Sequence, residues 1–152
     1  MRECAVQPGV DSRVIVIGAT NRPADLDDAV CRRLSRRIYV PLPDHQTRRQ
    51  LLQITLDPQI CALSEDELNQ VATATEGYSG SDLASLCKEA AMRPVRELSS
   101  DQLAVVDVQS LRTLTSADVL GSMSVVKPSV QAGVLKSFES WNAEFGSDIS
   151  SV

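Results

Sequence analysis

The stretch GATNRPADLDDAVCRRLSRRIYVPLPD, residues 18–44, decides the fold class of this chain of 152 residues. It overlaps RVIVIGA (13–19), a β-branched run ending in glycine that predicts a strand buried on both faces. A second run, RIYVPL (37–42), predicts another short strand that Pro43 stops. Between them, Asp27 to Leu34 predicts a short helix. The order of these elements indicates an α/β core.

Two strands alone cannot satisfy a strand that is buried on both faces. Such a strand needs neighbours that pair its N–H and C=O groups. We therefore expect the sheet to be incomplete here, with its other strands supplied from outside this sequence.

From Asp44 onward the pattern changes to helices, each opened by a residue that can cap free N–H groups. The predicted opening residues are Asp44, Ser64, Ser79, Thr115 and Ser129. Ser64 and Ser79 are followed three residues later by Glu67 and Asp82, the spacing of a capping box. Pro94 is expected to bend or fray the third of these helices.

Apolar residues at helical spacing predict the buried faces of these helices. The residues expected to face inward are Leu51, Leu52, Leu68, Val71, Ala72, Leu83, Leu86, Cys87, Ala90, Ala91 and Val95. The last helix carries Val134, Leu135, Phe138, Trp141 and Phe145.

The composition excludes several classes of protein. Hydrophobic residues at 43% and charged residues at 23% are typical of a globular domain. The longest apolar run, Val14 to Ile17, is far below the roughly 18 residues that a membrane span needs. Four cysteines stand 26 to 30 residues apart with one histidine, so neither a zinc site nor a redox motif is expected.

The net charge of −5 hides a division of the chain. Residues 1–56 carry nine arginines against six acids, whereas residues 57–152 carry six basic residues against fourteen acids. Six of the arginines lie between Arg32 and Arg49, with only Asp44 to oppose them. This segment is interpreted either as a solvated basic face or as a functional cluster.

Five motifs along the chain favour a functional cluster, with the solvated basic face kept as the alternative. They are GATNRP (18–23), RRLSRR (32–37), GYSGSDL (77–83), RPVREL (93–98) and WNAEFG (141–146). Together they resemble the second half of an AAA-type ATPase module, in particular the microtubule-severing group that includes spastin, katanin and fidgetin. The resemblance implies an atypical segment at 1–12, a partial AAA+ core at 13–43, a helical lid at 44–127 and a C-terminal helix with a short tail at 128–152.

The resemblance also implies roles for three residues of the first part. Asn21 resembles the polar residue that orients the attacking water beside the γ-phosphate; the alternative is an asparagine that satisfies the turn before Pro23. Arg32 and Arg33 resemble the arginine fingers that one subunit inserts into its neighbour's nucleotide site. For Arg36 and Arg37 the choice between a functional and a structural role stays open.

Three residues of the lid resemble those that contact the nucleotide. Gly80 and Ser81 lie at a predicted helix start, where bare backbone can approach a base and ribose. Leu51 is a candidate contact of the adenine, and a plain core leucine is the equal alternative.

The motif G-x-x-x-x-G-K-[ST] is absent from the sequence, as is an apolar run ending in paired acids before Asn21. ATP and magnesium are the cofactors that the resemblance implies, yet we do not expect this chain to hydrolyse ATP alone. The expected partners are other subunits of a hexameric ring and, through the full-length protein, microtubules, with a cytoplasmic location and no nucleic acid. The alternatives are a non-enzymatic subunit that docks on active ATPases, and a membrane-remodelling AAA relative.

Overall fold

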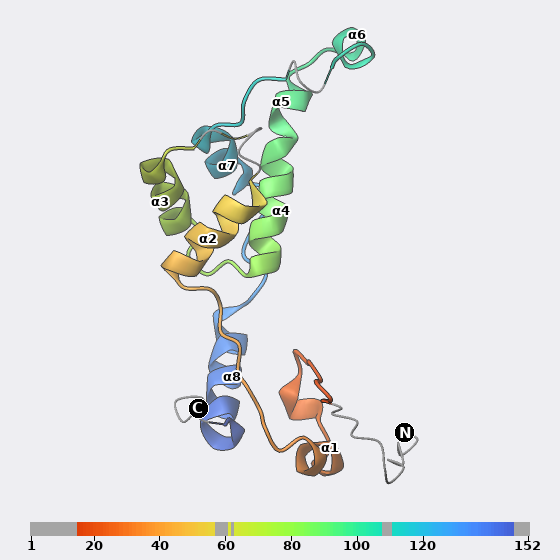
Figure 1. Ribbon diagram of the computed structural model, residues 1–152, viewed down its shortest axis with the longest axis vertical. Coiled ribbons are helices and arrows are strands. Elements are labelled where there is room, and N and C mark those ends of the chain that lie inside the picture. The colour runs from red at the N-terminus through yellow and green to blue at the C-terminus, as the bar shows by residue number, and fades with distance from the viewer. Residues whose placement is uncertain (1–14, 57–60, 62, 108–110, 148–152) are drawn as a thin grey trace, which may run out of the picture. The chain divides into compact units, whose positions relative to one another are not determined.

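The computed structural model describes residues 15–56, 61, 63–107 and 111–147 (Figure 1). The chain divides into two compact units, Met1–Arg37 and Ile38–Val152. The predicted irregular segment 1–12 lies outside the described residues, as do the first two residues of the predicted strand 13–19.

The first unit contains one turn of 3₁₀ helix, η1 (Pro23–Asp25), and the short helix α1 (Asp28–Arg33). The Asp27 side chain begins α1 by accepting a hydrogen bond from the N–H of Val30 at 2.7 Å. The helix predicted between the two apolar runs is therefore confirmed.

The two predicted strands do not form within the described residues. Residues 15–19 and 37–42 belong to no ladder, and the side chains of Ile15 and Ile17 are 83% and 88% exposed. The strand prediction is wrong here for a physical reason. A β-branched run becomes a strand only when neighbouring strands take up its N–H and C=O groups, and the described residues supply none.

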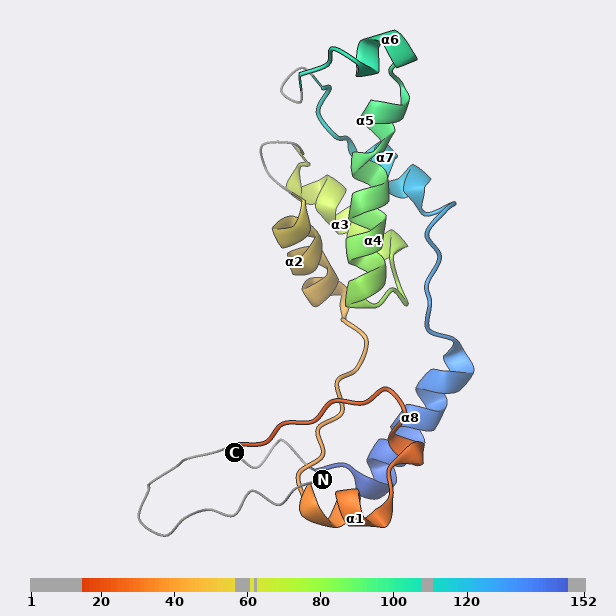
Figure 2. The ribbon, with the colours of Figure 1, turned by 90° about the vertical axis from the view of Figure 1, so that its right-hand side faces the viewer.

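The second unit is helical. Its elements are α2 (His45–Thr55), α3 (Glu65–Ala74), α4 (Gly80–Ala91), α5 (Arg93–Arg96), α6 (Ser100–Leu103), α7 (Ser116–Ser122) and α8 (Ala132–Phe145). Helix α4 packs against α2 and α7, and α3 packs against the same two helices (Figures 1 and 2). One isolated parallel bridge joins Cys61 to Leu114.

The predicted caps at Asp44, Ser64, Ser79 and Thr115 are confirmed. Asp44 accepts from the N–H of Thr47 at 2.8 Å, and the other three form complete capping boxes. Helix α4 ends at Ala91 and α5 begins at Arg93, so the expected break at Pro94 is also confirmed.

The core lies between α2, α3, α4 and α7. Its buried apolar residues are Leu52, Leu56, Cys61, Leu68, Val71, Ala72, Tyr78, Leu83, Leu86, Cys87, Ala90, Leu114 and Val119. Most of the predicted inward residues are among them. Ala91 is exposed because α4 ends there, and Val95 and Leu51 are only half-buried.

A buried arginine joins α2 to the end of α3. Arg48 is 7% exposed and donates from Nε and Nη2 to the carbonyl of Ala72, at 3.0 and 2.9 Å. Its Nη1 donates to the carbonyl of Pro43 at 2.9 Å. The guanidinium therefore satisfies the carbonyl of Pro43, just before α2 in the chain, and the carbonyl of Ala72 in the last turn of α3.

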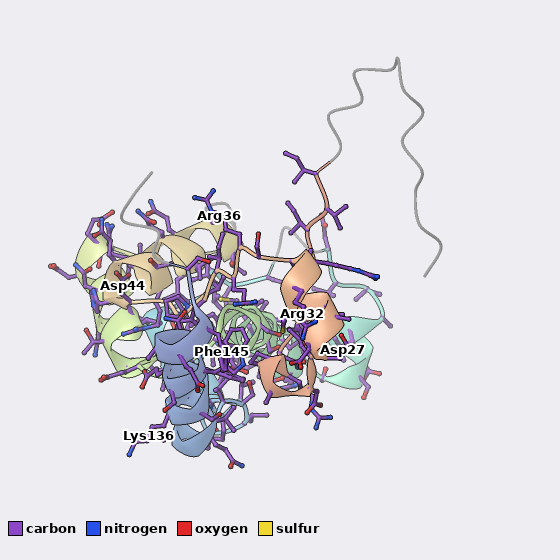
Figure 3. All side chains as sticks on the ribbon, turned by 90° about the horizontal axis from the view of Figure 1, so that it is seen from below. Asp27, Arg32, Arg36, Asp44, Lys136 and Phe145 are labelled. Atoms are coloured by element: carbon purple, nitrogen blue, oxygen red, sulfur yellow. The ribbon has the colours of Figure 1, made fainter. Side chains whose placement is uncertain are left out.

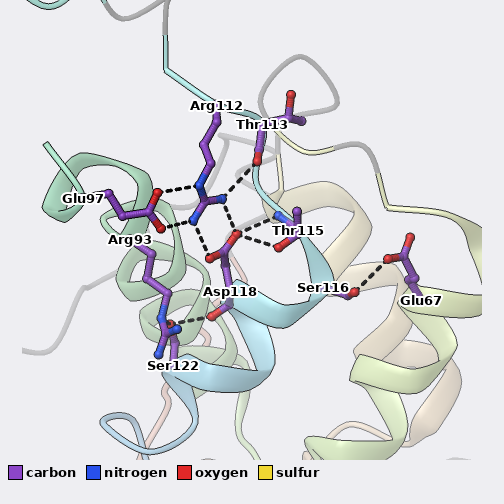
Figure 4. Close-up of polar contacts among 9 residues, drawn as sticks. All are labelled: Glu67, Arg93, Glu97, Arg112, Thr113, Thr115, Ser116, Asp118 and Ser122. Atoms are coloured by element: carbon purple, nitrogen blue, oxygen red, sulfur yellow. Dashed lines mark hydrogen bonds and ion pairs between the residues drawn. The ribbon is translucent and has the colours of Figure 1, made fainter.

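A second polar network holds the start of α7 (Figure 4). The carboxylate of Asp118 accepts from Arg112 Nη1 and Nη2 at 2.7 and 2.9 Å, and from the N–H and hydroxyl of Thr115 at 2.9 and 2.8 Å. Arg112 also donates from Nε to Glu97 at 2.8 Å. The hydrogen bonds from Arg112 hold the pKa of Asp118 well below its ordinary value.

Helix α8 begins later than predicted. Its N-cap is Gln131, which makes no side-chain capping bond, whereas Ser129 was expected to open the helix. Ser129 is instead bonded to Asp82, as described below. No residue of α8 is buried, and the rings of Trp141 and Phe145 lie against each other at a tilt of 43°, with centroids 5.4 Å apart.

Candidate functional site

The length of α1 determines where Arg32 and Arg33 lie. The helix has six residues, so Arg32 and Arg33 fall in its last turn, where positive charge is favoured by the helix dipole. Figure 3 shows Asp27 and Arg32 with this helix. Arg32 and Arg33 are exposed, and neither forms an ion pair with a described residue. Both guanidinium groups are therefore available to a ligand or partner.

Arg36 and Arg37 differ from each other. Arg37 is half-buried and donates from Nη2 to the carbonyl of Cys31 at 2.7 Å, which ties it to the last turn of α1. Arg36 is exposed. The structure thus gives Arg37 a role in holding α1, a distinction that the sequence left open.

Asn21 lies in an exposed turn and not at the end of a buried strand. The hydroxyl of Thr20 accepts from the N–H of Arg22 at 3.0 Å, and Arg22 Nε pairs with Asp25 at 2.9 Å. Among the described residues the turn is thus held by Thr20, Arg22 and Asp25, whereas one interpretation of the sequence assigns this task to Asn21. The buried strand end that would orient Asn21 is not formed by the residues from 15 onward that the structure describes.

The lid candidates lie where α4 begins. Gly77 has a φ of +81°, a conformation that glycine adopts without strain, and it turns the chain from α3 toward α4. The Ser79 hydroxyl then accepts from the N–H of Asp82 at 3.2 Å. The N–H groups of Gly80 and Ser81 precede the first intrahelical bond and are not served by this cap.

Gly80 and Leu51 lie side by side. A Cβ placed on Gly80 would be 3.9 Å from Leu51 Cδ1, in ordinary van der Waals contact. Gly80 and Ser81 are exposed and Leu51 is half-buried. The structure thus brings these three predicted residues together as a surface of bare backbone, a hydroxyl and an apolar side chain, which we call the Gly80 edge.

The six predicted residues fall in different units. Asn21, Arg32 and Arg33 belong to the first unit, and Leu51, Gly80 and Ser81 belong to the second. In the described part of the chain, no group of three or more His, Cys, Asp or Glu side chains is placed to hold a metal ion. These residues therefore offer magnesium no ligand set of that kind.

Asp82, which follows Ser81 in the chain, has a buried carboxylate that the sequence indicates only as part of a helix cap. Asp82 is 7% exposed, and its Oδ2 accepts from the N–H and hydroxyl of Ser79 at 2.9 and 2.8 Å. The same oxygen accepts from the N–H and hydroxyl of Ser129 at 3.2 and 3.1 Å. Burial alone would raise the pKa of Asp82, but these hydrogen bonds prevail and lower it.

Tyr78 makes a parallel connection. Its ring is 3% exposed, and its hydroxyl donates to the carbonyl of Val126 at 2.7 Å. The segment that leads to α8 is thus bonded at two points to the turn that begins α4. No local pattern in the sequence indicates the bond from Tyr78 to Val126, 48 residues along the chain.

Comparison with family models gives two matches. The model of the AAA family, the ATPases associated with various cellular activities, matches residues 4–42. The model of the AAA+ lid domain matches residues 65–109.

Among curated proteins the chain is similar to spastins. It is 45% identical to spastin of Naegleria gruberi over 138 residues, which are 91% of this chain and 26% of that protein. It is 48% identical to spastin of Xenopus laevis over 141 residues, 93% of this chain and 24% of that protein. The chain thus spans about a quarter of the length of these relatives.

Solved structures give the same assignment. A crystal structure of the FIGL-1 AAA domain in complex with ADP matches with a TM-score of 0.80 and 36% identity, over 85% of this chain and 44% of that one. A structure that describes katanin self-assembly matches with a TM-score of 0.68 and 28% identity, over 80% of this chain and 44% of that one. The predicted AAA+ fold class is thereby confirmed, although its two strands are not formed within the described residues; the chain matches the AAA family model and the AAA+ lid model, and is similar to spastins over about nine tenths of its length.

Proposed function

We propose that this chain carries the arginine fingers, the water-orienting asparagine and the nucleotide-contacting lid of a spastin-like microtubule-severing ATPase. The observation that carries the proposal is the 45–49% identity to spastins over about nine tenths of the chain, together with the exposure of Arg32 and Arg33 on α1. A guanidinium in trans stabilises the charge that develops on the transferred phosphoryl group, so exposure without an internal ion pair is what that role requires.

The proposal extends to the ligand and the ring. ADP is bound in the FIGL-1 neighbour, and we assign the Gly80 edge, with Leu51, to the base and ribose. When bound, magnesium would neutralise phosphate charge, and we assign it no ligand among the described residues. Self-assembly is described for the katanin neighbour, and we propose that this chain works in a cytoplasmic, microtubule-associated ring.

The test is to add the purified chain to an active, full-length spastin-like ATPase and to measure ATP turnover and microtubule severing. We expect a change in rate that Arg32→Ala with Arg33→Ala abolishes. The control, Arg49→Ala with Arg96→Ala, removes the same charge from two arginines of the helical unit that form ion pairs. If the control variant abolishes the change in rate as completely as the Arg32→Ala, Arg33→Ala variant does, the finger assignment is wrong.

The chain alone gives a second measurement. We expect no ATP turnover above background with magnesium, because the phosphate-loop motif is absent from its sequence. Turnover by the isolated chain that follows the protein through purification would contradict this.

A second candidate is a non-enzymatic subunit that docks on full-length ATPases and poisons the ring. The observation that favours it is α8, whose apolar side chains include Val134 and Phe145, 41% and 43% exposed. The mixing experiment separates the two. A docking subunit inhibits whether or not Arg32 and Arg33 are present, and it loses inhibition when α8 is removed.

A further inference from the structure

The Gly80 edge and the segment Val126–Ser129 are held by one carboxylate. Asp82 Oδ2 receives the N–H and hydroxyl of Ser79 from one side and the N–H and hydroxyl of Ser129 from the other, 47 residues along the chain. Gly80 and Ser81 are the two residues between Ser79 and Asp82. A movement of Ser129 therefore changes a hydrogen bond of the residue that fixes the backbone of the Gly80 edge.

The connection is more than an ordinary helix start. A capping box needs only the reciprocal bonds between its first residue and its fourth, and Ser79 and Asp82 provide them. The bonds from Ser129 and the bond from Tyr78 to Val126 are additional, and both involve the short segment that precedes α8. Ser129, which by sequence could have capped α8, donates to Asp82 instead.

We propose that Asp82 and Ser129 form a clamp that sets the Gly80 edge for nucleotide, so that Ser129 is a positioning residue for a ligand that it does not touch. The ligand class, a nucleoside diphosphate, rests on the proposed function. Through the clamp, a displacement of the segment that leads to α8 changes the affinity of the Gly80 edge for the nucleotide. By the reciprocity of linked equilibria, a ligand bound at the edge tightens the hold on that segment.

The experiment compares Ser129→Val with Ser129→Thr in the whole chain. The two side chains have the same shape, and only threonine keeps the hydroxyl. The readouts are the amide resonances and hydrogen exchange of Gly80, Ser81 and residues 126–131, followed by a titration with ADP. Ser137→Val is the matched control, because the exposed Ser137 hydroxyl donates to Val134 within its own helix, α8.

We expect Ser129→Val to shift the Gly80 and Ser81 amides and to weaken ADP binding about fivefold, the factor that one lost hydrogen bond gives. Ser129→Thr should restore both, and Ser137→Val should change neither. The melting temperature should stay within a few degrees throughout, because Ser129 is exposed.

The two proposals fail in different ways. If Ser129→Val leaves the Gly80 and Ser81 amides unmoved, or if it shifts them while ADP binds as tightly as before, the clamp is overturned and the nucleotide assignment stands. If the amides respond to Ser129→Val but ADP perturbs none of them in the unaltered chain, the clamp is supported and the nucleotide assignment of the edge fails.

Discussion

Asp118→Asn should destabilise the helical unit by about 3 kcal/mol. Asp118 is 6% exposed and accepts two hydrogen bonds from Arg112 and two from Thr115. Asparagine keeps one acceptor oxygen, which can still receive the Thr115 N–H, so most of the cap is retained. The new NH₂ group takes the place of Oδ1 and faces Arg112 Nη2, so that hydrogen bond is lost. The bond from Arg112 Nη1 to the remaining oxygen keeps a neutral acceptor only and is weakened.

The magnitude follows from these bonds. Hydrogen bonds to charged groups contribute roughly 1.5–3 kcal/mol each. The side chain of Arg112 is 38% exposed and keeps Glu97 as a partner, so water recovers part of the loss. A net cost of about 3 kcal/mol is large against the roughly 5–15 kcal/mol by which domains are stable.

The assay is urea unfolding near neutral pH, followed by far-ultraviolet circular dichroism. The matched control is Asp66→Asn, the same substitution in the first turn of α3, at an exposed residue with no ion pair among the described residues. We expect the control to stay close to the unaltered chain. A difference in unfolding free energy of less than about 0.5 kcal/mol between Asp118→Asn and Asp66→Asn, the size of an ordinary surface change, would contradict the described bonds of Asp118.

Three further predictions concern stability and reactivity. The pKa values of Asp82 and Asp118 are lowered in the folded state, so the stability that these carboxylates add is complete above the ordinary carboxyl pKa of about 4 and is lost as pH falls below it. The denaturant concentration at half-unfolding should therefore fall between about pH 7 and pH 3, and it should fall less steeply in Asp118→Asn. Arg48→Met should cost about 2–4 kcal/mol in the same unfolding assay, because the carbonyls of Ala72 and Pro43 lose the three hydrogen bonds from Arg48, and an unchanged midpoint would contradict these bonds. Burial raises the pKa of the Cys87 thiol to about 11, so a thiol reagent should modify the half-buried Cys31 before Cys87, and Cys87 only as the chain unfolds; equal rates in native buffer would argue against the described core.

The helical unit could be predicted from the sequence because its signals are local. Ser64 with Glu67 and Ser79 with Asp82 satisfy backbone groups within a single turn, so their spacing is sufficient to place α3 and α4. Helix α6 was missed although Ser99 and Gln102 have the same spacing and form the same box. A search for glutamine as well as acids in the fourth position would have found it.

Long-range features could not be predicted in this way. The run 13–19 has the composition of a buried strand, but a strand depends on partners that its own residues do not encode. Ser129 is a good cap by type, and only the folded chain shows that Asp82 takes its hydroxyl. Arg48 belongs to a basic segment by sequence, and its burial follows from the carbonyl of Ala72, 24 residues away.

The candidate site also has one part that the structure bears on and one part that stays a prediction. Leu51, Gly80 and Ser81 were chosen by resemblance, and the structure shows that they are neighbours on the helical unit. Their role stays a prediction, as do those of Asn21, Arg32 and Arg33.

In three helices of the second unit, an acid in the first turn completes the capping box and also accepts a hydrogen bond from a distant segment of the chain. Glu67 at the start of α3 also accepts from Ser116 at 2.7 Å, Asp82 from Ser129, and Asp118 from Arg112. The first turns of these helices are therefore linked: the start of α3 gains a further hydrogen bond from α7, and the start of α4 gains further bonds from the segment that leads to α8. The unit should gain and lose its helices in a single cooperative step, so that a deletion near residue 116 loosens the chain as far back as residue 64.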